Sequence, residues 1–218
     1  MRSMSSSNST RGIAAIVGVG PKLGRSIARK FAHEGYTVAI LARDLGVLSL
    51  GFVEVLVYNA YQPMCWNPTN FTDIRLDSFE KSLAVSSVGA FHCAQQVLPS
   101  MVERGRGTIL FTGCSASVSG IAGYSELCCG KFALRALSQC LAREFQPMGV
   151  HVAHVIIDGV IGPPRGASSS ERKSVGEQGV DGSMDPDALA QTYWHLHVQD
   201  RTAWTQEIDL RPSTPRFF

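Results

Sequence analysis

A chain of 218 residues with a formal net charge of +2 and 44% hydrophobic residues fits a single globular domain of ordinary size. The small charge gives no argument for a nucleic-acid partner. No apolar stretch approaches the roughly 18 residues that a membrane span requires. We therefore expect neither a nucleic-acid partner nor a membrane partner.

The cysteines favour a reducing compartment, and the N-terminus favours a disordered tail. The cysteines lack the spacing of metal ligands, so we expect no metal site and six free thiols, at Cys65, Cys93, Cys114, Cys128, Cys129 and Cys140. Residues 1–11 are rich in serine and lack acidic residues, which favours a disordered tail. The same composition is typical of organelle transit peptides, so the predicted localisation is cytoplasmic with organellar import left open.

The first third of the chain predicts three strands and one helix. Residues 13–18 (IAAIVG) form a short apolar run that ends in glycine, as buried parallel strands often do. The segment 25–35 has apolar residues at helical spacing and ends at Gly35. Further apolar runs predict strands at 36–43 and 53–60.

Strands and helices alternate through the rest of the chain. Strands are predicted at 107–113, 150–157 and 205–212, and helices at about 76–103, at about 124–146 and from Asp185 to about His197. Residues 162–184, rich in Gly and Ser, are predicted to form a mobile loop. The alternation predicts an α/β fold: one Rossmann-type, doubly wound parallel sheet with helices on both faces, over residues 12–218, with a C-terminal extension from about residue 185.

The connection between the second and third predicted strands is short. Residues 44–52 join Arg43 to Val53, whereas a parallel crossover with its helix needs at least ~10–12 residues. A doubly wound sheet normally has a further strand and two helices at this point. We therefore expect the sheet to lack one edge strand–helix unit.

A glycine-rich turn, GVGPKLG, follows the first predicted strand. Gly18 permits a tight turn, Gly20 lets the backbone approach a phosphate, and Gly24 allows the helix to pack closely on the strand. The start of the helix presents N–H groups to a pyrophosphate, with Lys22 and Leu23 in the turn. The segment predicts a dinucleotide-binding site, and a purely structural turn is the alternative.

Arg43 follows the second predicted strand, where the adenosine ribose of a bound dinucleotide is recognised. An acidic residue there favours NAD, whereas the guanidinium of Arg43 can bind a 2′-phosphate. Asp44 comes next in the chain. NADP is therefore the expected cofactor, with NAD as the alternative.

Several segments together resemble the short-chain dehydrogenase/reductase (SDR) family. GVGPKLG is similar to the family's glycine loop, with Lys22 in place of the middle glycine, and YNA to its Asn-Asn-Ala-Gly segment, with Tyr58 in place of the first Asn. GTILFTGCSAS resembles the segment that carries a catalytic Ser, and IIDGVIGPP a later Pro-Gly segment, with Asp158 in place of the proline. HVAHVIIDG and AWTQEIDLRP resemble a divergent branch of bacterial and plant members that lacks the usual catalytic Tyr.

The resemblance implies hydride transfer between a nicotinamide cofactor and a small-molecule carbonyl or alcohol, in a homodimer or homotetramer. Beyond the glycine loop, it implies cofactor contacts by Asn59, Ala60, Lys131, Gly159 and Ile161. It also implies that about 30 residues are missing after Asp44, the usual length of a strand–helix unit.

The family's catalytic residues are only partly present. Lys131 matches the catalytic Lys, but the residue four positions earlier, where the family has Tyr, is Leu127, which carries no proton. Cys114, followed by Ser115, stands at the Ser position, and Ser86 stands at the Asn position. The family's proton relay through Tyr therefore does not carry over to this chain.

Tyr124 is a candidate substitute for the missing acid. Residues 124, 127 and 131 share one face of a helix, so its phenol would lie one turn before Leu127; a packing role is the alternative. Cys114 could serve as a weak acid or a substrate contact. The sequence favours an NADP-dependent oxidoreductase. A catalytically impaired nucleotide-binding isoform, acting through binding or oligomerisation, is the alternative.

Overall fold

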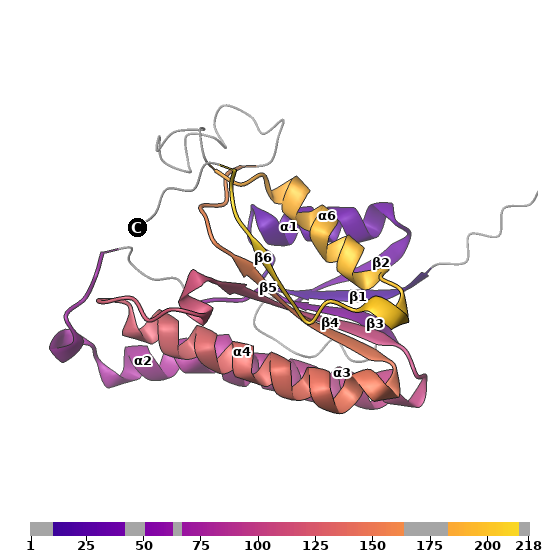
Figure 1. Ribbon diagram of the computed structural model, residues 1–218, viewed down its shortest axis with the longest axis horizontal. Helices are drawn as coiled ribbons and strands as arrows, with labels where there is room; N and C mark the ends of the chain where they lie inside the picture. The colour runs from indigo at the N-terminus through magenta and orange to yellow at the C-terminus, as the bar shows by residue number, and fades with distance from the viewer. Residues whose placement is uncertain (1–10, 42–50, 63–66, 164–182, 214–218) are drawn as a thin grey trace, which may run out of the picture.

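The computed structural model describes residues 11–41, 51–62, 67–163 and 183–213, which form a six-stranded sheet with helices on both faces (Figure 1). The strand order is β2-β1-β3-β4-β5-β6, and each neighbouring pair is parallel. The predicted Rossmann-type α/β fold is therefore confirmed. Most of the predicted tail, most of the predicted loop at 162–184, and both Arg43 and Asp44 lie outside the described residues.

The elements follow the predicted order closely. The strands are β1 (Arg11–Val17), β2 (Tyr36–Leu41), β3 (Val53–Tyr58), β4 (Gly107–Cys114), β5 (Val150–Ile157) and β6 (Glu207–Leu210). The helices are α1 (Leu23–His33), α2 (Leu76–Leu83), α3 (Gly89–Glu103), α4 (Ser125–Phe145) and α6 (Pro186–His197). The predicted helix at 76–103 differs in one respect, because a π-helical turn, η3 (Ala84–Val88), joins α2 to α3. None of the helices in the described ranges has the length and apolarity of a membrane span.

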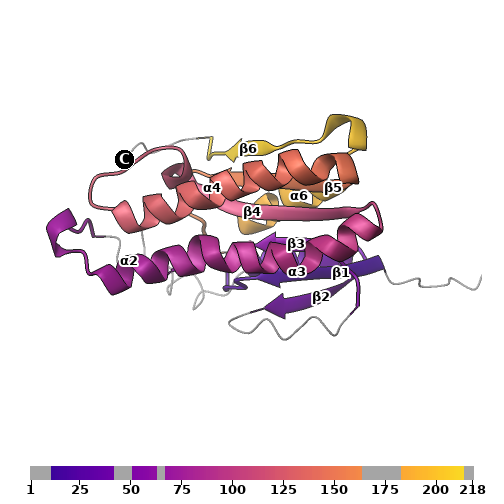
Figure 2. The same ribbon diagram turned by 90° about the horizontal axis from the view of Figure 1, so that it is seen from below.

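Strand β2 lies at one edge of the described sheet (Figure 2). It pairs with β1, and β3 pairs with the other side of β1, so the chain passes across β1 between Leu41 and Val53. Residues 42–50, where the missing unit is expected, lie outside the described residues, so that expectation stays a prediction. Because all the strands are parallel, their carboxyl ends meet at one end of the molecule, where ligands of open α/β sheets bind.

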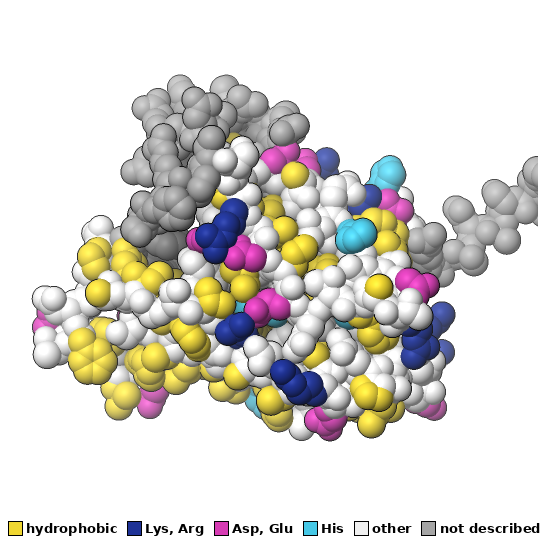
Figure 3. All heavy atoms as spheres, in the orientation of Figure 1, with side chains coloured by type: hydrophobic (Ala, Val, Ile, Leu, Met, Phe, Trp, Pro, Cys, Tyr) yellow, Lys and Arg dark blue, Asp and Glu magenta, His cyan; other side chains and the backbone are white. Residues whose placement is uncertain are grey.

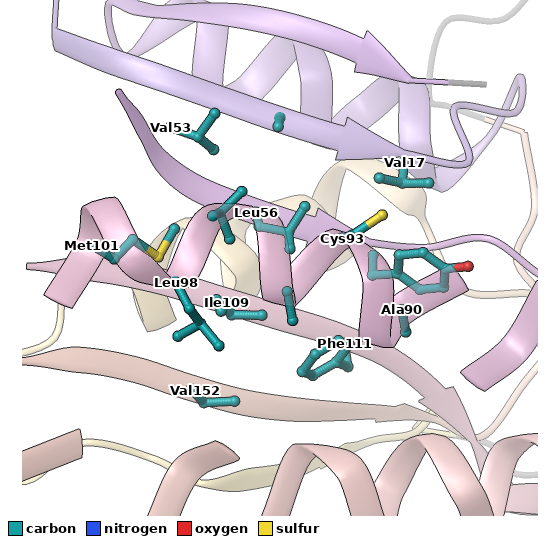
Figure 4. Packing of buried hydrophobic residues seen from close by; sticks show 14 of the residues in the cluster. Val17, Val53, Leu56, Ala90, Cys93, Leu98, Met101, Ile109, Phe111 and Val152 are labelled. Carbon is teal, nitrogen blue, oxygen red and sulfur yellow. The ribbon is translucent and has the colours of Figure 1, made fainter. Parts of the chain in front are cut away.

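Two apolar layers cover the two faces of the sheet. Helices α1 and α6 pack on one face, and α2, α3 and α4 lie on the other (Figures 1 and 2). Strand β5 contributes side chains to both layers, since Val152 packs on the α3–α4 side and Val155 on the α1–α6 side. On the α3–α4 side, Leu56, Met101 and Phe111 pack together with little or no exposed surface (Figure 4). These layers fix the positions of the strand ends that form the candidate site.

The C-terminal helix α6 is joined to the sheet by polar side chains as well as by apolar contacts. Asp185 caps its start by accepting a hydrogen bond from the backbone N–H of Asp187 at 3.0 Å, as the Asp-Pro pair predicted. At its end, the ring of His197 forms hydrogen bonds with the Tyr36 hydroxyl at 2.7 Å and with the Thr108 hydroxyl at 2.9 Å. The predicted helix through His197 is confirmed.

Candidate active site

The glycine loop between β1 and α1 is locked onto the end of β3. Gly18 has φ of +81°, and its N–H donates to the carbonyl of Leu41 at 3.1 Å. The side-chain amide of Asn59 donates to the carbonyl of Gly18 at 2.9 Å. A Cβ at Gly18 would overlap the backbone of Ala60. The structure thus brings together three of the predicted cofactor residues: Gly18, Asn59 and Ala60.

The other two glycines of the loop have different surroundings. A Cβ at Gly24 would collide with the carbonyl oxygen of Gly18, so close packing requires glycine there. A Cβ at Gly20 would have no heavy atom within 4 Å, so this position borders open space. Helix α1 begins at Leu23, and the N–H groups of a first helical turn have no partner within the helix. An open position beside such N–H groups fits a pyrophosphate.

Lys22 joins the glycine loop to the segment that follows β5. Its Nζ donates to the carbonyl of Ile161 at 2.7 Å, and burial lowers the pKa of the amine. Ile161 in turn forms a parallel bridge with Met184, just before α6. Met184 also contacts the predicted residue Gly159, where a Cβ would lie 2.9 Å from its sulfur. Ile161 therefore borders the glycine loop on the β5 side, and Gly159 lies next to it through Met184.

Lys131 is buried in α4, with 5% of its surface exposed. Its Nζ donates to the carbonyl of Thr112 in β4 at 2.9 Å. Burial lowers the pKa of Lys131, and the nearby Cys114 opposes this change. A Cβ at Gly130 would lie 2.8 Å from the Cβ of Ser86, so Ser86 packs beside the turn of α4 that carries Lys131. Lys131, at the family's Lys position, and Ser86, at its Asn position, are thus neighbours in this structure.

Cys114 ends β4, and Ser115 begins the short 3-10 turn η4 (Ser115–Ser117). The backbone N–H of Cys114 donates to the Ser117 hydroxyl at 3.2 Å, which fixes the turn. Burial raises the pKa of the Cys114 thiol, although the charge of Lys131 opposes this. The thiol is therefore protonated at neutral pH and can act as a weak hydrogen-bond donor, but it is no ready nucleophile.

The prediction that Tyr124 lies on the same helical face as Leu127 and Lys131 needs correction. Tyr124 is the N-cap of α4, with φ −128° and ψ 33°, and the helix begins at Ser125. Its carbonyl still accepts from the N–H of Cys128 at 3.0 Å, so the residue adjoins the first turn. Helical spacing does not set the direction of its side chain, because the residue itself is not helical. Leu127 lies in the first turn, half-buried.

Sequence analysis missed the part played by Tyr58 and the π-helical turn η3. The Tyr58 hydroxyl donates to the carbonyl of Val85 within η3, and burial raises the pKa of the phenol. A Cβ at Gly89 would overlap this hydroxyl. Ser86 lies in the same turn, and π-helical turns are frequent at functional sites. The sequence signal for this contact was Tyr58, which stands where the family has Asn. Its larger side chain requires a small residue nearby, and Gly89 is that residue.

Comparison with known proteins places the chain among dehydrogenases. The sequence profile of the family described as short chain dehydrogenase matches residues 46–173. A 3-ketodihydrosphingosine reductase from Bos taurus is 31% identical over 103 residues, which are 47% of this chain and 30% of that protein. A short-chain dehydrogenase/reductase from Armillaria gallica is 25% identical over 68% of this chain and 71% of its own length. The chain thus spans less than a third of the length of the bovine relative.

Solved structures share the fold over nearly the whole chain. A short-chain dehydrogenase from Rhodopseudomonas palustris is 28% identical with a TM-score of 0.74, and the match covers 92% of this chain and 98% of the other. A serine dehydrogenase complexed with NADP+ is 18% identical with a TM-score of 0.79, and the match covers 94% of this chain and 96% of the other. The second similarity shows the fold alone.

Proposed function

Because this chain belongs to the short chain dehydrogenase family, we propose that it is an oxidoreductase that transfers a hydride between NADP(H) and a small-molecule carbonyl or alcohol. One observation carries the proposal: the glycine loop borders open space at Gly20, directly before the N-terminus of α1. Lys131 lies in the helix that follows β4, and the loop follows β1, so both belong to the ligand-binding end of the sheet.

Lys131 and Lys22 supply the positive charge for the cofactor. Thr112 accepts one of the three N–H donors of Lys131, which leaves donors for the hydroxyls of the nicotinamide ribose. Lys22, now bonded to the carbonyl of Ile161, lies within the glycine loop, where an ammonium would attract the pyrophosphate. The preference for NADP over NAD is supported by Arg43, which lies outside the described residues.

Protonation of the substrate oxygen needs a group other than the family's Tyr. We assign this step to the Tyr124 phenol, which adjoins the first turn of α4, and we assign substrate contacts to Cys114 and Ser115 at the end of β4. Leu127 supports a second candidate function. A chain that binds the cofactor through Lys131 but has no acid at position 127 could act as a nucleotide-binding isoform without turnover.

The surroundings of the site favour an apolar substrate. Figure 3 shows hydrophobic side chains gathered at the end of the molecule where α2 begins. Exposed apolar residues follow the carboxyl ends of β3 and β4: Tyr61, Phe71, Val118 and Ile121. The segments that carry them meet where the N–H of Thr69 donates to the carbonyl of Gly123 at 3.0 Å. The relatives named as 3-ketodihydrosphingosine reductases point in the same direction, toward a ketone with a large apolar part.

A homodimer or homotetramer is part of the proposal. Val88 and Phe91, where η3 passes into α3, and Phe132 on α4 are exposed on the outer side of the helical layer. Apolar residues on two neighbouring helices suit a contact with a second copy of the chain. Size-exclusion chromatography with light scattering measures the mass, and a monomer at micromolar concentration would refute this part of the proposal.

Two measurements test the proposed function. Titration with NADPH should quench the tryptophan fluorescence, and NADP+ should bind more tightly than NAD+. Oxidation of NADPH is then followed at 340 nm (the reduced nicotinamide band) across ketones and aldehydes of increasing apolar size. Binding without turnover over the whole panel would favour the nucleotide-binding isoform. Absence of binding would refute the cofactor assignment itself.

A further inference from the structure

His154 is a buried, titratable residue beside the candidate site that the proposed function does not use. It lies on β5 with 1% of its surface exposed. Its side chain lies on the α4 side of the sheet, because Val152 and Val150, two and four positions earlier, belong to the apolar layer on that side. Its two ring nitrogens have distinct environments.

The Nδ1 atom of His154 faces a carboxylate. It lies 3.0 Å from Oε2 of Glu207 in β6. The guanidinium of Arg135 holds Glu207 through two hydrogen bonds of 2.7 and 2.8 Å and lowers the pKa of its carboxyl. Glu207 is therefore ionised and can only accept, so Nδ1 is the donor. A neutral His154 ring then has no proton on Nε2.

The Nε2 atom faces the β4 backbone at the place where Lys131 binds. A Cβ at Gly113 would overlap Nε2, so glycine at this position makes room for the ring. Nε2 is buried and has no hydrogen-bond partner among the described residues. The carbonyl that accepts from Lys131 belongs to Thr112, the residue directly before Gly113. The unprotonated nitrogen therefore faces Gly113, and the buried ammonium is held at the residue directly before it.

The charges around His154 favour its neutral form. Lys131 and Arg135 approach it from α4, and Glu207 approaches it from β6. Cys114, at the end of β4, has a thiol whose pKa is raised by burial, so it adds no negative charge at neutral pH. A protonated His154 would place three cations around a single carboxylate. A neutral ring instead adds no third cation, and it turns the negative end of its dipole, at Nε2, toward the part of β4 that holds the ammonium.

We propose that His154 is a positioning residue for Lys131: Glu207 fixes its Nδ1–H tautomer, and its unprotonated Nε2, turned toward the β4 backbone next to the carbonyl that holds Lys131, keeps the buried ammonium charged for a contact with the nicotinamide ribose. The proposal deepens the proposed function and rests on it for the ribose contact. The pairing of the ring with Lys131 can be tested without any cofactor.

The first test is the long-range 1H–15N spectrum of the cofactor-free protein labelled with 15N-histidine. The His154 signals are identified by their loss in His154→Phe. At pH 7 they should show a neutral ring with the proton on Nδ1, and Lys131→Met should raise the pKa of His154, because it removes the neighbouring cation. A proton on Nε2 at pH 7, or an unchanged pKa in Lys131→Met, would overturn the proposal whether or not a cofactor binds.

The second test measures the affinity for NADPH from pH 6 to 10. Affinity should fall on the alkaline side as Lys131 loses its proton, and His154→Phe should move this fall to lower pH. His154→Gln, whose amide oxygen can accept, should restore part of the shift. His151→Phe is the matched control, because His151 is equally buried on β5 but faces the other side and stacks on Trp204.

The outcomes separate the two proposals. Equal pH profiles in wild type, His154→Phe and His151→Phe would show that His154 has no effect on Lys131, even if both variants are less stable. A wild-type protein that fails to bind NADPH at any pH would refute the proposed function, and the histidine spectrum would still decide the pairing of His154 with Lys131.

Discussion

Leu127 and Lys131 lie one turn apart on α4 and concern two different steps. Lys131 is proposed to bind the cofactor, whereas Leu127 stands where the family has its proton donor. The buried ammonium of Lys131 is anchored at the carbonyl of Thr112, a position that suits a ribose contact. The Leu127 side chain can exclude water but carries no proton. At the level of single residues, the chain therefore has the charge that we propose for binding the nicotinamide ribose, and the proposed acid is a residue outside the family's pattern.

Replacing Lys131 tests the binding part of this division. Lys131→Ala should weaken NADPH binding about tenfold or more, because hydrogen bonds to a charged group contribute about 1.5–3 kcal/mol. Fluorescence titration measures the dissociation constant. Lys81→Ala is the control, since Lys81 is an exposed lysine of α2. Equal affinities in wild type and Lys131→Ala would contradict the assignment of Lys131 to the ribose.

Replacing Tyr124 tests the acid. Tyr124→Phe should leave NADPH affinity unchanged and reduce the rate of carbonyl reduction by about 10²–10⁴-fold, the usual contribution of a general acid. Tyr61→Phe is the matched control, because Tyr61 is exposed near the same end of the sheet. A Tyr124→Phe protein with the wild-type rate would show that the proton comes from elsewhere.

At the scale of elements, the π-helical turn η3 sets how Ser86 approaches α4. In a π-helical turn the backbone N–H groups bond to carbonyls five residues earlier rather than four. The Tyr58 hydroxyl donates to the Val85 carbonyl of this turn, and Gly89 leaves the space that the hydroxyl occupies. Three residues from β3, η3 and α3 therefore form one unit, which packs Ser86 against the turn of α4 that carries Lys131.

A double-mutant cycle tests this unit. Tyr58→Phe should lower the free energy of unfolding by about 1–3 kcal/mol, because the Val85 carbonyl loses its buried donor. Gly89→Ala should also destabilise the wild type, since its methyl group would overlap the hydroxyl. In the Tyr58→Phe background, the same Gly89→Ala change should cost less, as residues in contact are not additive. Urea unfolding measures all four proteins, and strictly additive effects would contradict the contact.

The elements also show how far sequence reasoning reaches. Strand β5 was predicted with its observed bounds, because an apolar run between polar segments needs no information from elsewhere in the chain. The turn η3 was missed, since the buried positions through it, Ser82, Ser86 and Ala90, keep a spacing of four residues that suits an α-helix equally well. The glycine loop was predicted from local spacing, but the His154–Glu207 contact joins residues 53 positions apart and depends on the pairing of β5 with β6. Local patterns therefore predicted the elements and the loop, and long-range contacts decided the rest of the site.

For the whole molecule, two buried histidines on β5 connect stability to pH. His151 and His154 each have 1% of their surface exposed. Burial lowers the pKa of both rings. The carbonyl of Thr205 opposes this effect at His151, and Glu207 opposes it at His154. The unfolded chain therefore binds protons more readily than the folded protein as pH falls toward the usual histidine pKa of about 6.5.

The free energy of unfolding should therefore decrease as pH falls below about 6.5, before most carboxylates titrate. The sign follows from linkage: a group whose pKa is lower in the folded state stabilises the protein above its unfolded pKa, and this stabilisation is lost on acidification. His151→Phe, which keeps an aromatic ring against Trp204, should reduce the slope between pH 7 and 5. His33→Gln should not, because His33 is exposed at the end of α1. Urea unfolding at four pH values measures the slope, and equal slopes in wild type and His151→Phe would mean that this ring does not contribute to the acid sensitivity.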